Sequence, residues 1–232
     1  MGLFDKFKRK TIKTPEQRRA ISNKKIKDRG IACYENLPVL EDSSQVKLKD
    51  IDEICKRAIA CLLSTQIAMD ADTENYEQSK EMFYKLLKEF GVQDDLLSKE
   101  KKVFFGHYSK QDVIDVAWTY EAYWSLVWAL GLIDDIEFEY PKDICDCRKA
   151  ITLVGDCKSY DEFKSKCRLR DAEEILDMLD LYYRYHWATT EKRIHPDTPI
   201  GELNKDVVVE RRRGLEWLIS DVKDWNYISL DT

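Results

Sequence analysis

Residues that interrupt helices are scarce along this chain of 232 residues. It contains 8 glycines and 5 prolines, about half of the average share of these two residue types. Sandwiches and barrels of short strands need turn residues every few positions, so this chain is a poor candidate for them. Because 44% of the residues are hydrophobic and 11% are aromatic, the chain can also build a core. These features predict an ordered, all-helical protein.

Helix-start patterns recur along the chain. An N-capping residue followed three positions later by an acidic residue occurs at Asp50, Ser109, Ser159 and Asp171, and Thr14 precedes a proline at the first helical position. Asp206 is expected to cap the last helix, and we find no convincing strand. The sequence therefore predicts a single globular all-α domain of about eight to nine helices. The expected ranges are 15–29, 51–69, 74–90, 98–106, 109–131, 144–154, one helix from 159, one from 171, and 207–220.

One stretch of the chain is almost uncharged. Residues 116–133 contain a single charged side chain, Glu121, and reach the lower length limit of a transmembrane helix. The stretch is nevertheless followed by two aspartates, and no lysine or arginine cluster flanks it. All six tryptophans lie after residue 117. We therefore expect a buried, tryptophan-rich central helix of a soluble protein, with core helices over 107–232 and N-terminal helices over 14–106.

Charge is unevenly distributed along the sequence. Residues 1–30 carry 11 basic and 3 acidic side chains, a charge of +8, whereas the rest of the chain carries −14. The acidic total of −6 argues against a general nucleic-acid binder. The basic segment is expected either to pack on an acidic face of its own domain or to contact an anionic membrane weakly. Residues 1–13 would form that arm. Its membrane-contacting residues would be Leu3, Phe4, Phe7, Lys8, Arg9 and Lys10.

The seven cysteines are irregularly spaced and follow no recognisable secretory signal. This usage is typical of reduced thiols, and we expect a cytoplasmic protein. A zinc site is a remote alternative, because the spacing matches no ordinary zinc knuckle. Buried thiols are the more common outcome for such residues. The cysteines of the alternative metal site would be Cys145, Cys147, Cys157 and Cys167.

Three predicted helices carry charged residues within or beside their hydrophobic stripes. These residues are Glu121, Arg184 and Arg211, with Asp180 one turn before Arg184. A buried arginine needs a carboxylate partner, so one interpretation is a structural network of ion pairs. The other is a ligand pocket with aromatic walls and convergent charges. The candidate residues are Trp118, Glu121, Asp180, Tyr183, Arg184, His186, Trp187, Glu210 and Arg211.

No sequence motif of a known catalytic type is present. The chain lacks a nucleophile elbow, a P-loop, a dinucleotide-binding glycine pattern and a zinc-protease helix. We therefore expect a non-enzymatic interaction or accessory protein and no cofactor. The alternative is a small-molecule or anion-binding protein, with or without catalysis, that uses Glu121, Arg184, His186 and Arg211.

Three sequence segments carry a family resemblance. They are WTYEAYWSLVWALG at 118–131, DLYYRYHWA at 180–188 and VERRRGLEWL at 209–218. Together they resemble the bacterial domain of unknown function 4272 family. The resemblance implies a soluble, mainly helical bacterial protein with no assigned activity, and it supplies no catalytic residue. The chain departs from the family pattern at Arg213 and Gly214, where we expect a larger residue followed by alanine, so helix packing there is expected to differ.

Overall fold

The computed structural model describes residues 12–232. Within them it contains nine α-helices, two short 3₁₀ helices and no strand, which confirms the all-α prediction. The elements are α1 (Pro15–Asp28), α2 (Ile51–Asp70), α3 (Tyr76–Glu89), η1 (Gln93–Asp95), α4 (Ser98–Phe105), α5 (Lys110–Ala129), α6 (Cys147–Gly155), α7 (Tyr160–Lys166), α8 (Ala172–Ile194), α9 (Lys205–Ile219) and η2 (Trp225–Tyr227).

Most predicted helix starts are confirmed to within one residue, and three are wrong. Helix α3 begins at Tyr76 rather than at residue 74. Thr14, Ser109 and Asp171 each form a complete capping box. Helix α6 begins at Cys147 rather than at residue 144, because the Asp146 side chain accepts the Lys149 amide and fixes the N-cap there. Helix α9 is capped by Asn204 rather than Asp206. The Asn204 side chain accepts hydrogen bonds from the backbone amides of Asp206 and Val207, at 3.1 and 3.4 Å.

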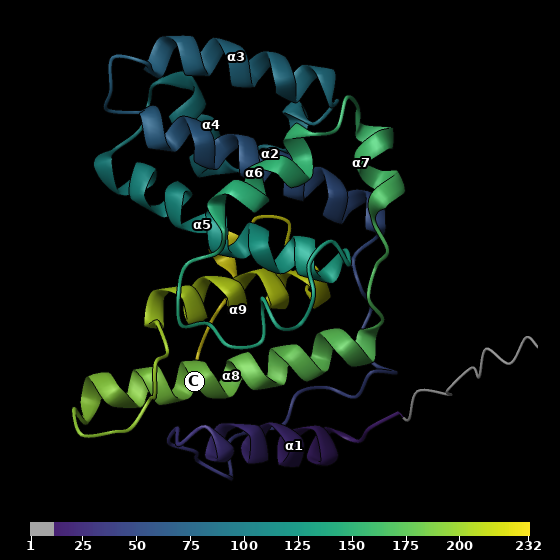
Figure 1. Cartoon of the computed structure of the whole chain (residues 1–232), viewed down its shortest axis with the longest axis vertical. Coiled ribbons are helices and arrows are strands. Elements are labelled where there is room, and N and C mark those ends of the chain that lie inside the picture. Colours follow the sequence, from purple (N-terminus) through teal and green to yellow (C-terminus); the bar gives the residue numbers. More distant parts are fainter. Residues whose placement is uncertain (1–11) are drawn as a thin grey trace, which may run out of the picture.

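The helices stack in layers (Figure 1). Helix α5 packs against α2 on one side and α9 on the other, and α8 packs against both α9 and α1. In the view of Figure 1, α3 lies at the top of the stack and α1 at the bottom. The loop between α1 and α2 therefore spans the stack, and helices from both halves of the sequence share one domain.

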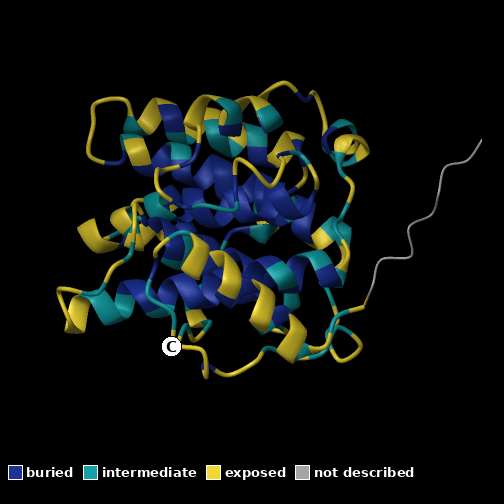
Figure 2. Ribbon diagram, turned by 60° about the horizontal axis from the view of Figure 1, so that its bottom comes forward, coloured by how far each residue is buried: buried dark blue, intermediate teal, exposed yellow. Residues whose placement is uncertain are grey.

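Helix α5 is the buried centre of this stack. Its residues from Thr119 to Ala129 are all buried, among them Trp124 and Trp128. Figure 2 shows buried ribbon through the middle layers and exposed ribbon on the outer helices and loops. A helix that is apolar on nearly every side needs neighbours on opposite faces, which α2 and α9 supply. No helix among residues 12–232 has the length and hydropathy needed to cross a membrane.

Helices α5 and α9 approach each other closely at Gly214. A Cβ atom built on Gly214 would lie 2.7 Å from both the Ala122 carbonyl oxygen and the Ser125 Cβ. The Ser125 hydroxyl also donates to the Arg211 carbonyl oxygen at 2.8 Å. This close approach brings the charged residues of α9 within reach of Glu121 on α5.

Candidate functional site

Glu121 and Arg211 form a buried ion pair between α5 and α9. Arg211 Nε lies 2.8 Å from Glu121 Oε2, and both side chains are at most 3% exposed. The other Glu121 oxygen accepts the Cys145 backbone N–H at 2.7 Å. The remaining Arg211 nitrogens face the Phe138 and Asp143 carbonyl oxygens at 3.5 and 3.3 Å. Each charged group is therefore satisfied by the protein itself.

Asp180 and Arg184 form a second buried pair, one turn apart on α8. Arg184 Nε and Nη2 lie 2.9 and 2.6 Å from the two Asp180 oxygens, and both side chains are at most 1% exposed. Arg184 Nη2 also lies 3.5 Å from the Pro38 carbonyl oxygen in the α1–α2 loop. This bidentate pair ties α8 to the loop that spans the stack.

His186 belongs to a third group, built around Arg212 rather than Arg211. Arg212 Nη1 lies 2.8 Å from His186 Nδ1, and a guanidinium can only donate, so Nδ1 accepts. Arg212 also binds Glu216 at 3.1 Å and the Leu230 and Asp231 carbonyl oxygens. Burial, with the nearby Arg212 charge, lowers the pKa of His186 to about 4. His186 is therefore a neutral acceptor near neutral pH.

This lowered pKa predicts a pH dependence of stability. Between pH 6.5 and about 4 the unfolded chain protonates His186 and the folded chain does not, so stability falls as the pH drops through that window. We expect His186 to account for a loss of about 2 kcal/mol, after discounting for partial solvation. Urea unfolding of the parent and of His186→Gln at pH 7.5 and 4.5 measures this loss. Glutamine can still accept a hydrogen bond from Arg212, but it does not titrate.

Parallel losses in the two proteins between these pH values would contradict this assignment. Titration of the buried carboxyls Glu100, Glu210 and Glu216, whose pKa values burial raises, affects both proteins alike. The comparison therefore isolates the imidazole.

The other aromatic residues of the predicted site lie apart from Glu121. The Tyr183 ring packs against the Arg212 guanidinium, and the Arg212 Cζ atom lies 4.7 Å from the ring centroid. Trp187 stacks on Tyr34 with a centroid distance of 5.9 Å. The structure thus divides most of the nine predicted residues among separate pairs and packing contacts on α5, α8 and α9. Trp118 alone joins two others at clefts: it lines an apolar cleft with Glu121 and a polar cleft with Glu210.

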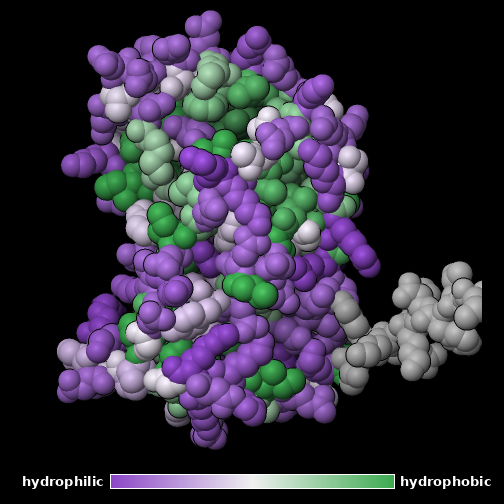
Figure 3. Space-filling model, in the orientation of Figure 1, coloured by the Kyte–Doolittle hydropathy of each residue, from purple (hydrophilic) through white to green (hydrophobic). Residues whose placement is uncertain are grey.

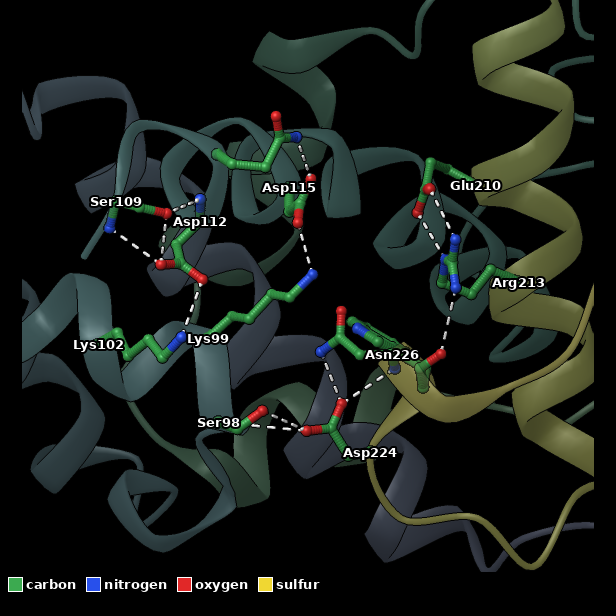
Figure 4. Close-up of polar contacts among 12 residues, drawn as sticks. Ser98, Lys99, Lys102, Ser109, Asp112, Asp115, Glu210, Arg213, Asp224 and Asn226 are labelled. Atoms are coloured by element: carbon green, nitrogen blue, oxygen red, sulfur yellow. Dashed lines mark hydrogen bonds and ion pairs between the residues drawn. The ribbon is translucent and has the colours of Figure 1, made fainter. Parts of the chain in front are cut away.

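That cleft opens between α4, α5, α9 and η2. Its volume is about 390 Å³, within the range of small ligand pockets. Its walls carry two ion pairs (Figure 4). Lys99 on α4 binds Asp115 on α5 at 2.5 Å, and Arg213 binds Glu210 on α9 at 3.1 Å. The lining residues are Lys99, Gln111, Ile114, Asp115, Trp118, Thr119, Asp206, Val209, Glu210, Arg213 and Asn226.

The charges of this polar cleft are held by neighbouring segments. Arg213 also donates to the Trp225 carbonyl oxygen at 3.3 Å, and Asp224 binds the Asn226 amide and the Ser98 hydroxyl (Figure 4). Burial raises the pKa of Glu210, and the Arg213 charge partly offsets this rise. The cleft therefore presents paired, pre-positioned charges of both signs rather than a cationic anion clamp.

An apolar cleft adjoins the polar one across Trp118. It has a volume of about 240 Å³ and is lined almost wholly by apolar surface. Figure 3 shows hydrophobic surface gathered in the upper half of the view, among hydrophilic side chains. Because Trp118 lines both clefts, they form one continuous surface, here called the Trp118 surface. The residues lining the apolar cleft are Met69, Ala117, Trp118, Tyr120, Glu121, Ile144, Cys145 and Cys147.

The cysteine set proposed for a metal is not gathered at one point. Cys145 and Cys147 lie beside the apolar cleft, whereas Cys157 lies against Lys166, 3.1 Å from its Nζ. Among residues 12–232, no group of three or more histidine, cysteine or acidic side chains has the placement of a metal site. The predicted membrane-contacting residues, from Leu3 to Lys10, lie outside the described residues.

Sequence reasoning missed the charged lining of the polar cleft. Lys99, Asp115 and Arg213 come from three different helices, and none interrupts a hydrophobic stripe. Each therefore looks like an ordinary surface charge. Of the residues that line this cleft, the sequence-based candidates include only Trp118 and Glu210.

The match to one family covers nearly the whole described chain. The model of a domain of unknown function, DUF4272, matches residues 18–228, and the chain belongs to this family. No curated protein and no solved structure matches the sequence.

Proposed function

We propose that this protein is a non-catalytic interaction protein that binds its partner at the Trp118 surface. The observation that carries the proposal is the placement of Trp118, partly exposed between a polar and an apolar cleft. Binding hot spots are enriched in tryptophan and arginine, set in pockets with a polar rim. Trp118 and Arg213 supply both residue types at this surface.

The pairing of the buried charged side chains with one another supports the same proposal. The arginines that could have clamped an anion, Arg184 and Arg211, already bind carboxylates in the interior. His186 accepts from Arg212 and is neutral near pH 7. These groups stabilise the fold, so binding is left to the outer surface, where charged pairs of both signs adjoin an apolar cleft. A protein segment with an apolar side chain next to charged residues complements both halves.

Site-specific photo-crosslinking in cells of the source organism tests this proposal. A benzophenone amino acid replaces Ile114, at the polar cleft, or Ile144, at the apolar cleft. Matched positions outside both clefts are Ile151 and Ile194: exposures are 41% and 58% at the cleft positions against 42% and 56% at the controls. We expect the same protein adduct from both cleft positions and none from the controls.

Loss of the adduct on mutation completes the test. Trp118→Ala should weaken the adduct about tenfold or more, as for an interface hot spot. Ile144→Arg, at an exposed position that leaves the core intact, should do the same if Trp118→Ala unfolds the chain. Equal labelling at all four positions contradicts the proposal. Adducts of small-molecule mass favour a ligand-binding protein instead.

We also propose that the protein works in the bacterial cytoplasm. The support is its cysteine usage, with seven residues that form no disulfide in the structure. A cell-fractionation blot against the native protein checks this location.

A further inference from the structure

A further cleft lies between α3 and α4, apart from the Trp118 surface. Both helices pack on α2, and both lie in the upper part of the stack in the view of Figure 1. At the start of α3, the Tyr76 hydroxyl donates to the Val103 carbonyl oxygen of α4 at 2.6 Å. The cleft has a volume of about 500 Å³ and shares no lining residue with the polar or the apolar cleft. It is therefore separate from the surface proposed for partner binding.

Aromatic rings line this cleft, here called the aromatic cleft. The rings of Tyr84 and Phe105 both line it, with centroids 6.0 Å apart and an interplanar angle of 71°. Phe104 is buried, and its ring centroid lies 6.4 Å from that of Tyr84. The Phe105 side chain, in contrast, is 49% exposed. Because the rings of Tyr84 and Phe105 meet at a steep angle, they wall two sides of a corner instead of stacking flat.

A carboxylate lies on the same helix face as one of these rings. Glu77, Glu81 and Tyr84 follow one another at spacings of four and three residues along α3, so they share a face. Glu77 binds Lys80 at 3.3 Å, and Lys80 Nζ also lies over the Tyr76 ring, 5.6 Å from its centroid. Glu81 lines the cleft, is exposed, and forms no ion pair with any residue from 12 to 232. The aromatic cleft therefore offers one carboxylate to a positively charged ligand.

The Tyr84 ring already attracts an ammonium group of the protein itself. Lys88 Nζ lies over this ring, 4.6 Å from its centroid, within the range of a cation–π interaction. Lys88 is not among the residues that line the aromatic cleft, so its ammonium group does not fill it. The chemistry that holds a cation against Tyr84 is thus present beside a cleft that has room for a ligand.

We propose that the aromatic cleft binds a small organic cation with a trimethylammonium group. The methyl groups contact the rings of Tyr84 and Phe105, and the positive charge lies beside the Glu81 carboxylate. Aromatic side chains are the usual partners of quaternary ammonium ligands. A planar guanidinium group stacks flat on a single ring, whereas a trimethylammonium group is round and fills a corner between two. This site does not depend on the Trp118 surface, so either proposal can fail without the other.

A comparison of two ligands of the same shape tests this proposal. Purified full-length protein is titrated with choline, and saturation-transfer NMR follows the choline methyl protons. The control ligand is the uncharged tert-butyl analogue of choline, in which carbon replaces the nitrogen. We expect saturable choline binding and at least about fivefold weaker binding of the analogue, because the analogue lacks the attraction of a cation to the rings and to the carboxylate. Equal affinity for the two ligands, or no saturable choline signal, would overturn the proposal.

Substitutions at exposed positions assign the binding to this cleft. Phe105→Leu and Glu81→Gln should each weaken choline binding about fivefold or more, and Glu81→Gln should leave binding of the uncharged analogue unchanged. Matched controls outside the cleft are Tyr227→Leu, at a ring that is 76% exposed, and Glu89→Gln, at the end of the same helix. All four variants should keep the helical circular-dichroism spectrum of the parent, because each replaces an exposed side chain. Choline binding that persists in both cleft variants, or that falls equally in the controls, contradicts the site.

Discussion

Replacing Arg211 by alanine is expected to lower the free energy of unfolding by about 3–5 kcal/mol, the cost of leaving a buried charge without its partner. Glu121 would keep its bond from the Cys145 amide but lose its cation, although its side chain is only 3% exposed. Urea denaturation of the two proteins at pH 7.5, followed by circular dichroism, measures the difference.

Two controls separate the lost pairing from the lost volume. Lys24→Ala removes a cation from an exposed pair with Asp28, and its effect should stay within about 0.5 kcal/mol. Replacing Glu121 and Arg211 together by leucine and methionine should recover much of the stability lost by Arg211→Ala, because neither charge is then stranded. An Arg211→Ala variant that unfolds at the same urea concentration as the parent would refute the view that this pair supports the fold.

Gly214→Ala is expected to destabilise the protein by about 2 kcal/mol, although alanine is the better helix former by about 1 kcal/mol. The added methyl group would lie 2.7 Å from the Ala122 carbonyl oxygen and from the Ser125 Cβ. Because both belong to the facing helix, α5 and α9 must move apart. The thermal midpoint, followed by circular dichroism, should fall accordingly.

A second helical glycine provides the matched control for this variant. A Cβ on Gly155 would have only the Ile151 methyl within reach, at 3.9 Å. Gly155→Ala should therefore raise stability by up to about 1 kcal/mol through helix propensity and a less flexible unfolded chain. Opposite signs for the two variants are the expected result. A stabilised Gly214→Ala would mean that the helices can separate at little cost.

The burial of the charged residues on α5, α8 and α9 could be predicted from the sequence. Glu121 and Arg211 each fall within or beside an apolar stripe, so their burial follows from helical periodicity, and the cost of burying a lone charge predicts that each has a partner. Asp180 and Arg184, four residues apart on one helix, are a similar case. Periodicity gives no distance between helices, however. It therefore could not show that Arg184 and Arg211 stand in separate pairs, or that His186 contacts Arg212.

The surface now proposed for binding depends on three-dimensional packing. Lys99 and Asp115 meet because α4 packs on α5, and Glu210 and Arg213 join them because α9 packs on the same helix.

The sequence by itself determined the all-helical fold, the buried central helix, most helix starts and the need to pair the internal charges. Each of these depends on local backbone preference, on periodicity within one helix, or on the cost of burying a lone charge. Only the tertiary structure decided which charges pair and where Trp118 meets solvent. Those outcomes depend on how helices from distant parts of the chain are placed against one another, and a pattern within one helix carries no such information.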